Sequence, residues 1–123
     1  MEGYKRSDRV ASRMQEELTL MLRKLQDPRL EGAVITRIEL TDDLSFARIF
    51  VRKELLLEDD APAKKRLLRG FDAASSRLRQ NVGRALGLRH TPELRFQYDT
   101  GQDAAIRVEE LLREIARDKD PAG

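Results

Sequence analysis

The residues best suited to chemistry in this chain are cations, and they gather between Ala61 and Tyr98. This window holds nine lysines and arginines against two acids, Asp72 and Glu93, so its charge is +7 although the whole chain carries only +2. Such local density favours a phosphate-rich partner, because each forked guanidinium can grip two phosphate oxygens. The cations are Lys64, Lys65, Arg66, Arg69, Arg77, Arg79, Arg84, Arg89 and Arg95.

A helical pattern after the pair Ser75-Ser76 could place several of these cations on one exposed surface. With about 3.6 residues per turn, its outer side carries Ser76, Arg77, Gln80, Gly83 and Arg84, with Arg79 on the other flank. Free N–H groups at the start of this helix, together with the serine hydroxyls, could hold a phosphate. Each arginine could equally be an ordinary solvated charge.

The loop after this helix adds His90 beside Arg89, which could stack on a base or contact a phosphate, or could be incidental. The cluster is a candidate phosphate-binding surface. Its candidate residues are Ser75, Ser76, Arg77, Gln80, Arg84, Arg89, His90, Lys64 and Lys65. A secondary basic group lies near the N-terminus, where Glu16 and Glu17 could simply balance it: Lys5, Arg6, Arg9 and Arg13.

Catalytic patterns are absent from the sequence. Asp42-Asp43 and Asp59-Asp60 offer paired carboxylates, but adjacent acids also make turns and helix caps. There is no cysteine, a single histidine, no Gly-rich phosphate loop and no metal-ligand spacing. We therefore expect no enzymatic activity, no catalytic residue, no metal, no cofactor and no small-molecule substrate.

Length and composition indicate one small domain. A chain of 123 residues can build a single core, and periodic apolar spacing argues against disorder although 37% of the residues are charged. The N-terminus has no apolar signal-peptide core, and no apolar run approaches membrane-spanning length. We expect a cytoplasmic protein without membrane contact.

The first half of the chain predicts a helix and a β-hairpin. The helix begins near Ser7 or Asp8 and ends at Asp27-Pro28; its apolar face consists of Val10, Met14, Leu18, Met21 and Leu25. Strands at 33–41 and 45–53 follow, joined tightly enough to be antiparallel. Their expected inward residues are Val34, Thr36, Ile38 and Leu40, then Ala47, Ile49 and Val51. The second strand leaves Phe46, Arg48, Phe50 and Arg52 on its other face, either as a partly covered sheet surface or as a base-stacking platform.

The second half predicts two consecutive helices, a third strand and a last helix. A helix begins at Asp60 with Pro62, breaks at Ser75-Ser76, and resumes until Gly87. Leu94, Phe96 and Tyr98 alternate in the third strand, whose neighbour in the sheet the sequence leaves open. A final helix should span about Asp103 to Ala116, with a frayed tail beyond it. This order predicts a two-layer α+β domain.

The ordered residues resemble the ribosome-binding factor A family of bacterial small-subunit assembly factors. The matching segments cover roughly residues 5–99. They are Arg9-Val10, Asp27-Pro28-Arg29, Thr36-Arg37-Ile38-Glu39-Leu40, Asp43-Leu44-Ser45, Ala47-Arg48-Ile49-Phe50-Val51, Leu88-Arg89, Pro92-Glu93-Leu94-Arg95-Phe96 and Tyr98-Asp99.

The resemblance implies a type II KH-like domain in residues 1–99, with order αββααβ and the helices on one face of a three-stranded sheet. Residues 100–123 would add a C-terminal helix and tail. In that family a kink at an Ala-x-Gly sequence replaces the usual KH loop; here the matching positions are Ala74, Ser75 and Ser76, so serine stands where the family has glycine. Because serine can cap the following helix, we expect a kink rather than one continuous helix.

The resemblance also implies a function. The chain would be a non-catalytic, monomeric factor that binds the immature small (30S) ribosomal subunit through 16S rRNA and assists its maturation. The alternative is a protein-only adaptor that uses the Phe46 and Phe50 face or the last helix.

Overall fold

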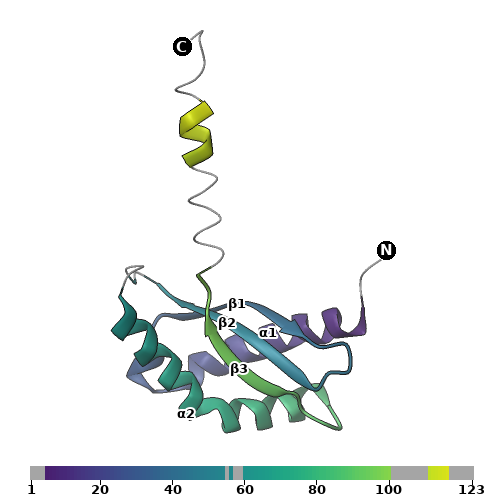
Figure 1. Cartoon of the computed structure of the whole chain (residues 1–123). Coiled ribbons are helices and arrows are strands. Elements are labelled where there is room, and N and C mark those ends of the chain that lie inside the picture. The colour runs from purple at the N-terminus through teal and green to yellow at the C-terminus, as the bar shows by residue number, and fades with distance from the viewer. Residues whose placement is uncertain (1–4, 55, 57–59, 101–110, 117–123) are drawn as a thin grey trace.

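The computed structural model describes residues 5–54, 56, 60–100 and 111–116. It contains a three-stranded sheet with two long helices packed on one of its faces (Figure 1). The elements are α1 (Arg6–Lys24), the 3-10 turn η1 (Pro28–Leu30), β1 (Ala33–Leu40), β2 (Phe46–Lys53), α2 (Ala61–Leu86) and β3 (Glu93–Tyr98). The α+β fold class expected from the sequence is confirmed.

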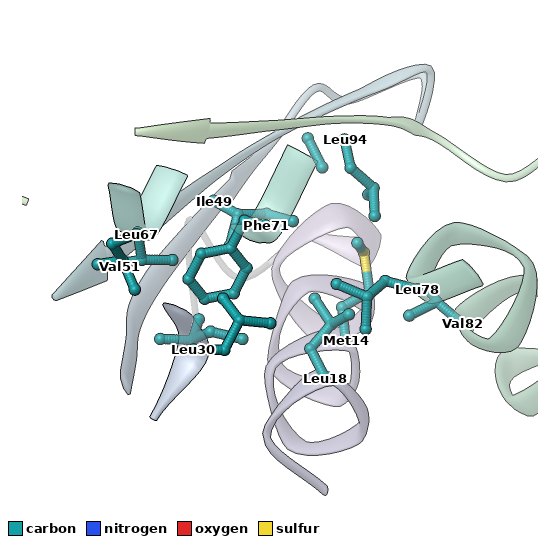
Figure 2. Packing of buried hydrophobic residues seen from close by; sticks show 12 residues of the cluster. Met14, Leu18, Leu30, Ile49, Val51, Leu67, Phe71, Leu78, Val82 and Leu94 are labelled. Carbon is teal, nitrogen blue, oxygen red and sulfur yellow. The ribbon is translucent and has the colours of Figure 1, made fainter. Parts of the chain in front are cut away.

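The core lies between the helices and the sheet. Ala47, Ile49 and Val51 of β2 are fully buried, as predicted. Figure 2 shows Met14 and Leu18 of α1 and Leu78 of α2 pointing toward one another. Aliphatic side chains fill most of this layer, because the chain has few aromatic residues. One aromatic pair contributes to it: Phe71 stacks on Phe96, with ring centroids 4.8 Å apart. The remaining buried members of this cluster are Leu30, Ile35, Leu67, Val82 and Leu94.

The order of strands is β1-β2-β3, with β2 in the centre. β1 and β2 are antiparallel, as predicted, whereas β3 pairs parallel to β2. The helix α2 therefore serves as the crossover between two parallel strands. This topology settles the neighbour of the third strand, and it brings the loop before β3 back against the end of α2.

A β-bulge in β1 changes which residues face the core. The register with β2 shifts between Ile35 and Arg37, so Ile35 is buried while Val34 is 39% exposed. The prediction that Val34 faces the core is therefore wrong, because the extra residue reverses the alternation. Thr36 does not pack inward as an apolar position would: its hydroxyl donates to the buried Asp99 carboxylate at 2.6 Å.

The helix α2 is one continuous element of 26 residues, which corrects the expected order αββααβ to αββαβ. Ser75 and Ser76 lie inside it rather than at a break. The predicted kink appears as a bend: Figure 1 shows that the axis of α2 changes direction part-way along. Serine costs an interior helical turn only a few tenths of a kcal/mol, which is too little to end a helix that is packed on both sides of the bend.

A helix cap and a turn account for one acid of each pair. The Asp60 carboxylate accepts from the Ala63 N–H at the start of α2, and Asp43 accepts from the Ser45 N–H and hydroxyl in the hairpin turn. Asp42 accepts from the Ser7 hydroxyl. The helix α1 begins at Arg6, slightly before the predicted Ser7 or Asp8. Asp59 lies outside the described residues.

Residues 111–116 are helical, in agreement with the end of the expected last helix. Its expected beginning at Asp103 and the tail after Ala116 lie outside the described residues. Within the part of the chain that is described, no helix is long and apolar enough to cross a membrane.

Candidate nucleic-acid interface

The outward face of α2 follows from its buried stripe. Leu67, Phe71, Leu78 and Val82 are buried at helical spacing and leave the opposite side to solvent. The exposed residues there include Ser76, Arg77, Gln80 and Arg84, as predicted. Ser75, also a candidate, is partly buried.

Gly83 departs from the prediction because it is buried rather than on the outer side. A side-chain Cβ at this position would overlap Oγ1 of Thr91 in the following loop. Glycine is therefore needed for this loop to lie directly on the helix.

The loop between α2 and β3 is held in place by specific bonds. Gly87 adopts a left-handed conformation (φ 64°) that ends the helix, and the Leu88 N–H donates to the Gly83 carbonyl. Arg79 then donates from Nε to the Pro92 carbonyl at 3.1 Å and from Nη2 to the Thr91 carbonyl at 2.9 Å. One guanidinium thus ties two consecutive carbonyls of the loop to the helix.

This arrangement forms an open hollow of about 440 Å³ between α2 and the loop, which we call the loop-side hollow. Four predicted residues line it: Ser76, Gln80, Arg89 and His90. Arg79 and Thr91 complete its lining and were not among the candidates. No spacing rule in the sequence pairs residue 79 with the carbonyls of the loop, because that contact depends on the chain reversal at Gly87.

The predicted sides of Arg77 and Arg79 are wrong: Arg79 shares the loop-side hollow with Ser76 and Gln80, whereas Arg77 lies on the other flank of α2. It lines a hollow of about 180 Å³ that also includes Lys24 of α1, and a second of about 520 Å³ beside η1. Arg29 lines the second hollow but is paired with Asp27, with Nη2 and Oδ2 2.7 Å apart. The hydrogen bond from Arg29 lowers the pKa of Asp27. The predicted pair Arg77 and Arg84 is exposed, but Arg84 lines none of these three hollows.

Gly70 allows η1 to lie against α2 beside Arg77. A Cβ on Gly70 would stand 2.9 Å from Cδ2 of Leu30 and 3.0 Å from Cβ of Arg29. This glycine therefore shapes the surface rather than merely weakening the helix.

Lys64 and Lys65 lie apart from the loop-side hollow. They belong to the first turns of α2, about 18 Å along the helix from Ser76 at 1.5 Å per residue. The Lys64 ammonium lies over the Tyr98 ring, 4.8 Å from its centroid. The structure therefore does not bring these two lysines together with Arg89 and His90.

The secondary basic group lies on the first turns of α1. Lys5 forms an exposed ion pair with Asp42 at 3.3 Å, and Arg6, Arg9 and Arg13 are exposed. Exposed pairs of this kind contribute little to stability. These cations are accessible, and they line none of the hollows described above.

The open face of the sheet is not a stacking platform at Phe50. That ring is only 5% exposed, and the Arg37 guanidinium carbon lies 4.0 Å from its centroid. Glu39 pairs with Arg37 and Arg48 on the same face. The structure thus favours the interpretation of this face as a partly covered surface with ordinary cross-strand contacts. Among the described residues, no three acidic or histidine side chains gather as a metal ion would require.

Comparison with known proteins identifies the family. The family model for ribosome-binding factor A matches residues 6–112. The chain belongs to the ribosome-binding factor A family. The ribosome-binding factor A of Sorangium cellulosum is 54% identical over 90% of this chain and 89% of its own length. That of Trichlorobacter lovleyi is 39% identical over 95% and 93%.

Solved structures of ribosome-binding factor A share the fold, which is KH-like. The solution structure of a putative ribosome-binding factor A from Thermotoga maritima has a TM-score of 0.69 at 28% identity, covering 82% of this chain and 93% of its own. The crystal structure from Thermus thermophilus has a TM-score of 0.65 at 22% identity, covering 75% and 93%. A Thermus thermophilus homology model fitted into a map of a 30S complex has a TM-score of 0.56 at 25% identity, covering 71% and 88%.

Proposed function

We propose that this chain binds the immature 30S ribosomal subunit through 16S rRNA and assists its maturation as a non-catalytic factor. The observation that carries the proposal is the loop-side hollow, where Arg89, His90, Gln80 and Ser76 converge on one exposed site. The 30S complex described for a Thermus thermophilus relative supports the choice of partner.

The chemistry of the hollow suits an unpaired nucleotide. Its volume of about 440 Å³ lies within the range of small-ligand sites. The Arg89 guanidinium can grip a phosphate, the His90 ring can stack on a base, and the Gln80 amide offers both a donor and an acceptor to a base edge. Folded rRNA exposes such nucleotides in its loops and bulges.

The exposed arginines outside the hollow would extend this contact along the RNA backbone. Arg84 lies on the same helix, while Arg77 faces the flank that it shares with Lys24. These cations need not touch bases, because phosphate contacts position a protein without reading sequence. Residues 1–99 would then act as the RNA-binding domain, in monomeric form in the cytoplasm, with residues 100–123 as an appended segment.

Charge neutralisation tests the proposal. Arg84→Gln with Arg89→Gln should weaken binding to immature 30S subunits about tenfold and reduce the slope of log affinity against log salt by roughly one to two. The matched control is Arg48→Gln with Arg95→Gln, which removes the same charge from the open sheet face. Arg9→Gln with Arg13→Gln measures the contribution of the secondary basic group.

Three results would contradict the proposal. The first is unchanged affinity of the folded Arg84 and Arg89 variant. The second is an equal loss in the Arg48 and Arg95 control, which would indicate attraction by net charge alone. The third is a flat salt response, which would instead support the protein-only adaptor.

A further inference from the structure

A second hollow of different chemistry lies between the end of α1, η1 and the start of β1. It has a volume of about 610 Å³, and we call it the α1–β1 groove. Its apolar lining comes from two helical turns and one strand edge: Leu22, Leu25, Leu30, Ala33, Val34 and Ile35. This volume is typical of sites that take a ligand or several side chains.

The bulge in β1 makes part of this lining accessible. Val34 is 39% exposed because the register shift turns it away from the core. Leu22 and Leu25 are only partly buried against the core cluster. The groove therefore combines a packed apolar floor with an outer edge at Val34, whose register partner is Arg52 of the open sheet face. An apolar anchor residue could be held between this floor and this edge.

The charged residues around this groove are mainly acidic. They are Arg23, Asp27, Glu31 and Glu54. Asp27 is already paired with Arg29, whereas Glu31 and Glu54 form no ion pair within the part of the chain that the structure describes. Two unpaired acids of the lining, Glu31 and Glu54, thus stand against Arg23, with the Lys53 side chain next to Gly32. The lining is weakly acidic, in contrast to the basic lining of the loop-side hollow.

We propose that the α1–β1 groove binds a Lys/Arg-rich protein segment that inserts an apolar side chain against Val34. The acidic rim would attract such a segment and repel RNA phosphates. The loop-side hollow would therefore bind RNA, and the α1–β1 groove would bind a positively charged protein segment. One flank of the domain would hold RNA and the other a basic protein segment of the same ribonucleoprotein particle.

Charge and backbone geometry disfavour the two other occupants. Residues 103–118 of this chain carry five acids against three arginines, so the acidic rim would repel its own C-terminal segment. A second copy cannot extend the sheet far along β1, because the Gln15 amide already donates to the carbonyls of Ile35 and Thr36 at the bulge.

The test uses the full chain and an array of overlapping short peptides that covers the proteins of the small subunit. Lys/Arg-rich peptides containing a large apolar residue should bind. For the strongest of them, Glu31→Lys with Glu54→Lys should raise Kd by about tenfold or more. Val34→Ser, which changes no charge, should raise Kd several-fold. The matched control is Glu16→Lys with Asp72→Lys, exposed acids outside the groove, and it should leave Kd unchanged.

Other outcomes overturn the inference. These are the absence of any bound Lys/Arg-rich peptide, an equal loss in the Glu16 and Asp72 control, or a dimer in sedimentation that Val34→Ser dissociates. A shift of the amide resonances of residues 111–116 on Val34→Ser would assign the groove to the C-terminal segment instead. Affinity for rRNA is measured on the same variants, so failure of RNA binding and failure of peptide binding are separate results.

Discussion

Arg79 of α2 donates through Nε to the backbone carbonyl of Pro92, 3.1 Å away, at the entrance to β3. Its Nη2 atom donates to the preceding carbonyl of Thr91 at 2.9 Å. This side chain does not point freely into solvent as a phosphate ligand would. It fixes the loop that carries Arg89 and His90, and so acts as a positioning residue for the loop-side hollow.

We expect Arg79→Lys to lower the free energy of unfolding by about 1 kcal/mol and to weaken rRNA binding. An ammonium cannot reproduce the fork that reaches two carbonyls at once, although it keeps the charge. Denaturant unfolding and rRNA titration provide the two readouts. Arg77→Lys is the control for stability, because Arg77 has no such backbone partner among the described contacts, and it should leave the free energy of unfolding nearly unchanged. Equal behaviour of the two lysine variants would show that Arg79 contributes only charge.

Gly83 and Thr91 should be energetically coupled. Gly83→Ala places a methyl group against the Thr91 hydroxyl, so the loop must shift at a cost of about 1–3 kcal/mol. Thr91→Ala removes that hydroxyl and leaves only the Thr91 Cβ, 3.4 Å from the added methyl carbon. The double variant should therefore recover most of the loss, as a double-mutant cycle in urea unfolding would measure. Additive effects would mean that the two residues do not pack together.

Periodicity is sufficient to predict α1, the core residues of β2 and the exposure of Ser76, Arg77, Gln80 and Arg84 on α2, because each depends on neighbours within a few residues. The 3.6-residue repeat predicts Gly83 on the solvent side of the helix, because this repeat contains no information about a loop that folds back onto the helix. Val34 was placed inside because a bulge leaves no mark in an alternating pattern. Long-range contacts decide both positions.

Acid should destabilise the fold through two aspartates whose pKa values are lowered in the folded state. The pKa of Asp27 lies below 3.8 chiefly because of its hydrogen bond from Arg29, and that of Asp43 because of those from Ser45 and Thr41. A lowered pKa stabilises the fold above the unfolded value, and that stability is lost as the pH falls through the folded value. We expect the free energy of unfolding to decrease below about pH 4.

In the variant Asp27→Asn with Asp43→Asn, the free energy of unfolding should fall less steeply below about pH 4, because these two side chains no longer titrate. We call this part of the pH profile the acidic limb. Asp72→Asn, at an exposed position of α2, is the matched control and should leave the limb as steep as in the parent chain. Unfolding by urea at a series of pH values measures the difference. A limb that stays equally steep in the double variant would place the acid sensitivity elsewhere.

Ser76 reports whether α2 is one helix in solution. In a continuous helix, alanine at an exposed interior position is more stable than glycine by about 1 kcal/mol. The free energy of unfolding of Ser76→Ala should therefore exceed that of Ser76→Gly by about 1 kcal/mol. As an internal reference, the free energy of unfolding of Asp72→Ala should exceed that of Asp72→Gly by a similar amount. A sharp break at the serine pair would instead favour glycine, since it adopts non-helical conformations at little cost. Urea unfolding of the four variants distinguishes a bend from a break, because only a break would abolish or reverse the alanine advantage at Ser76 while keeping it at Asp72.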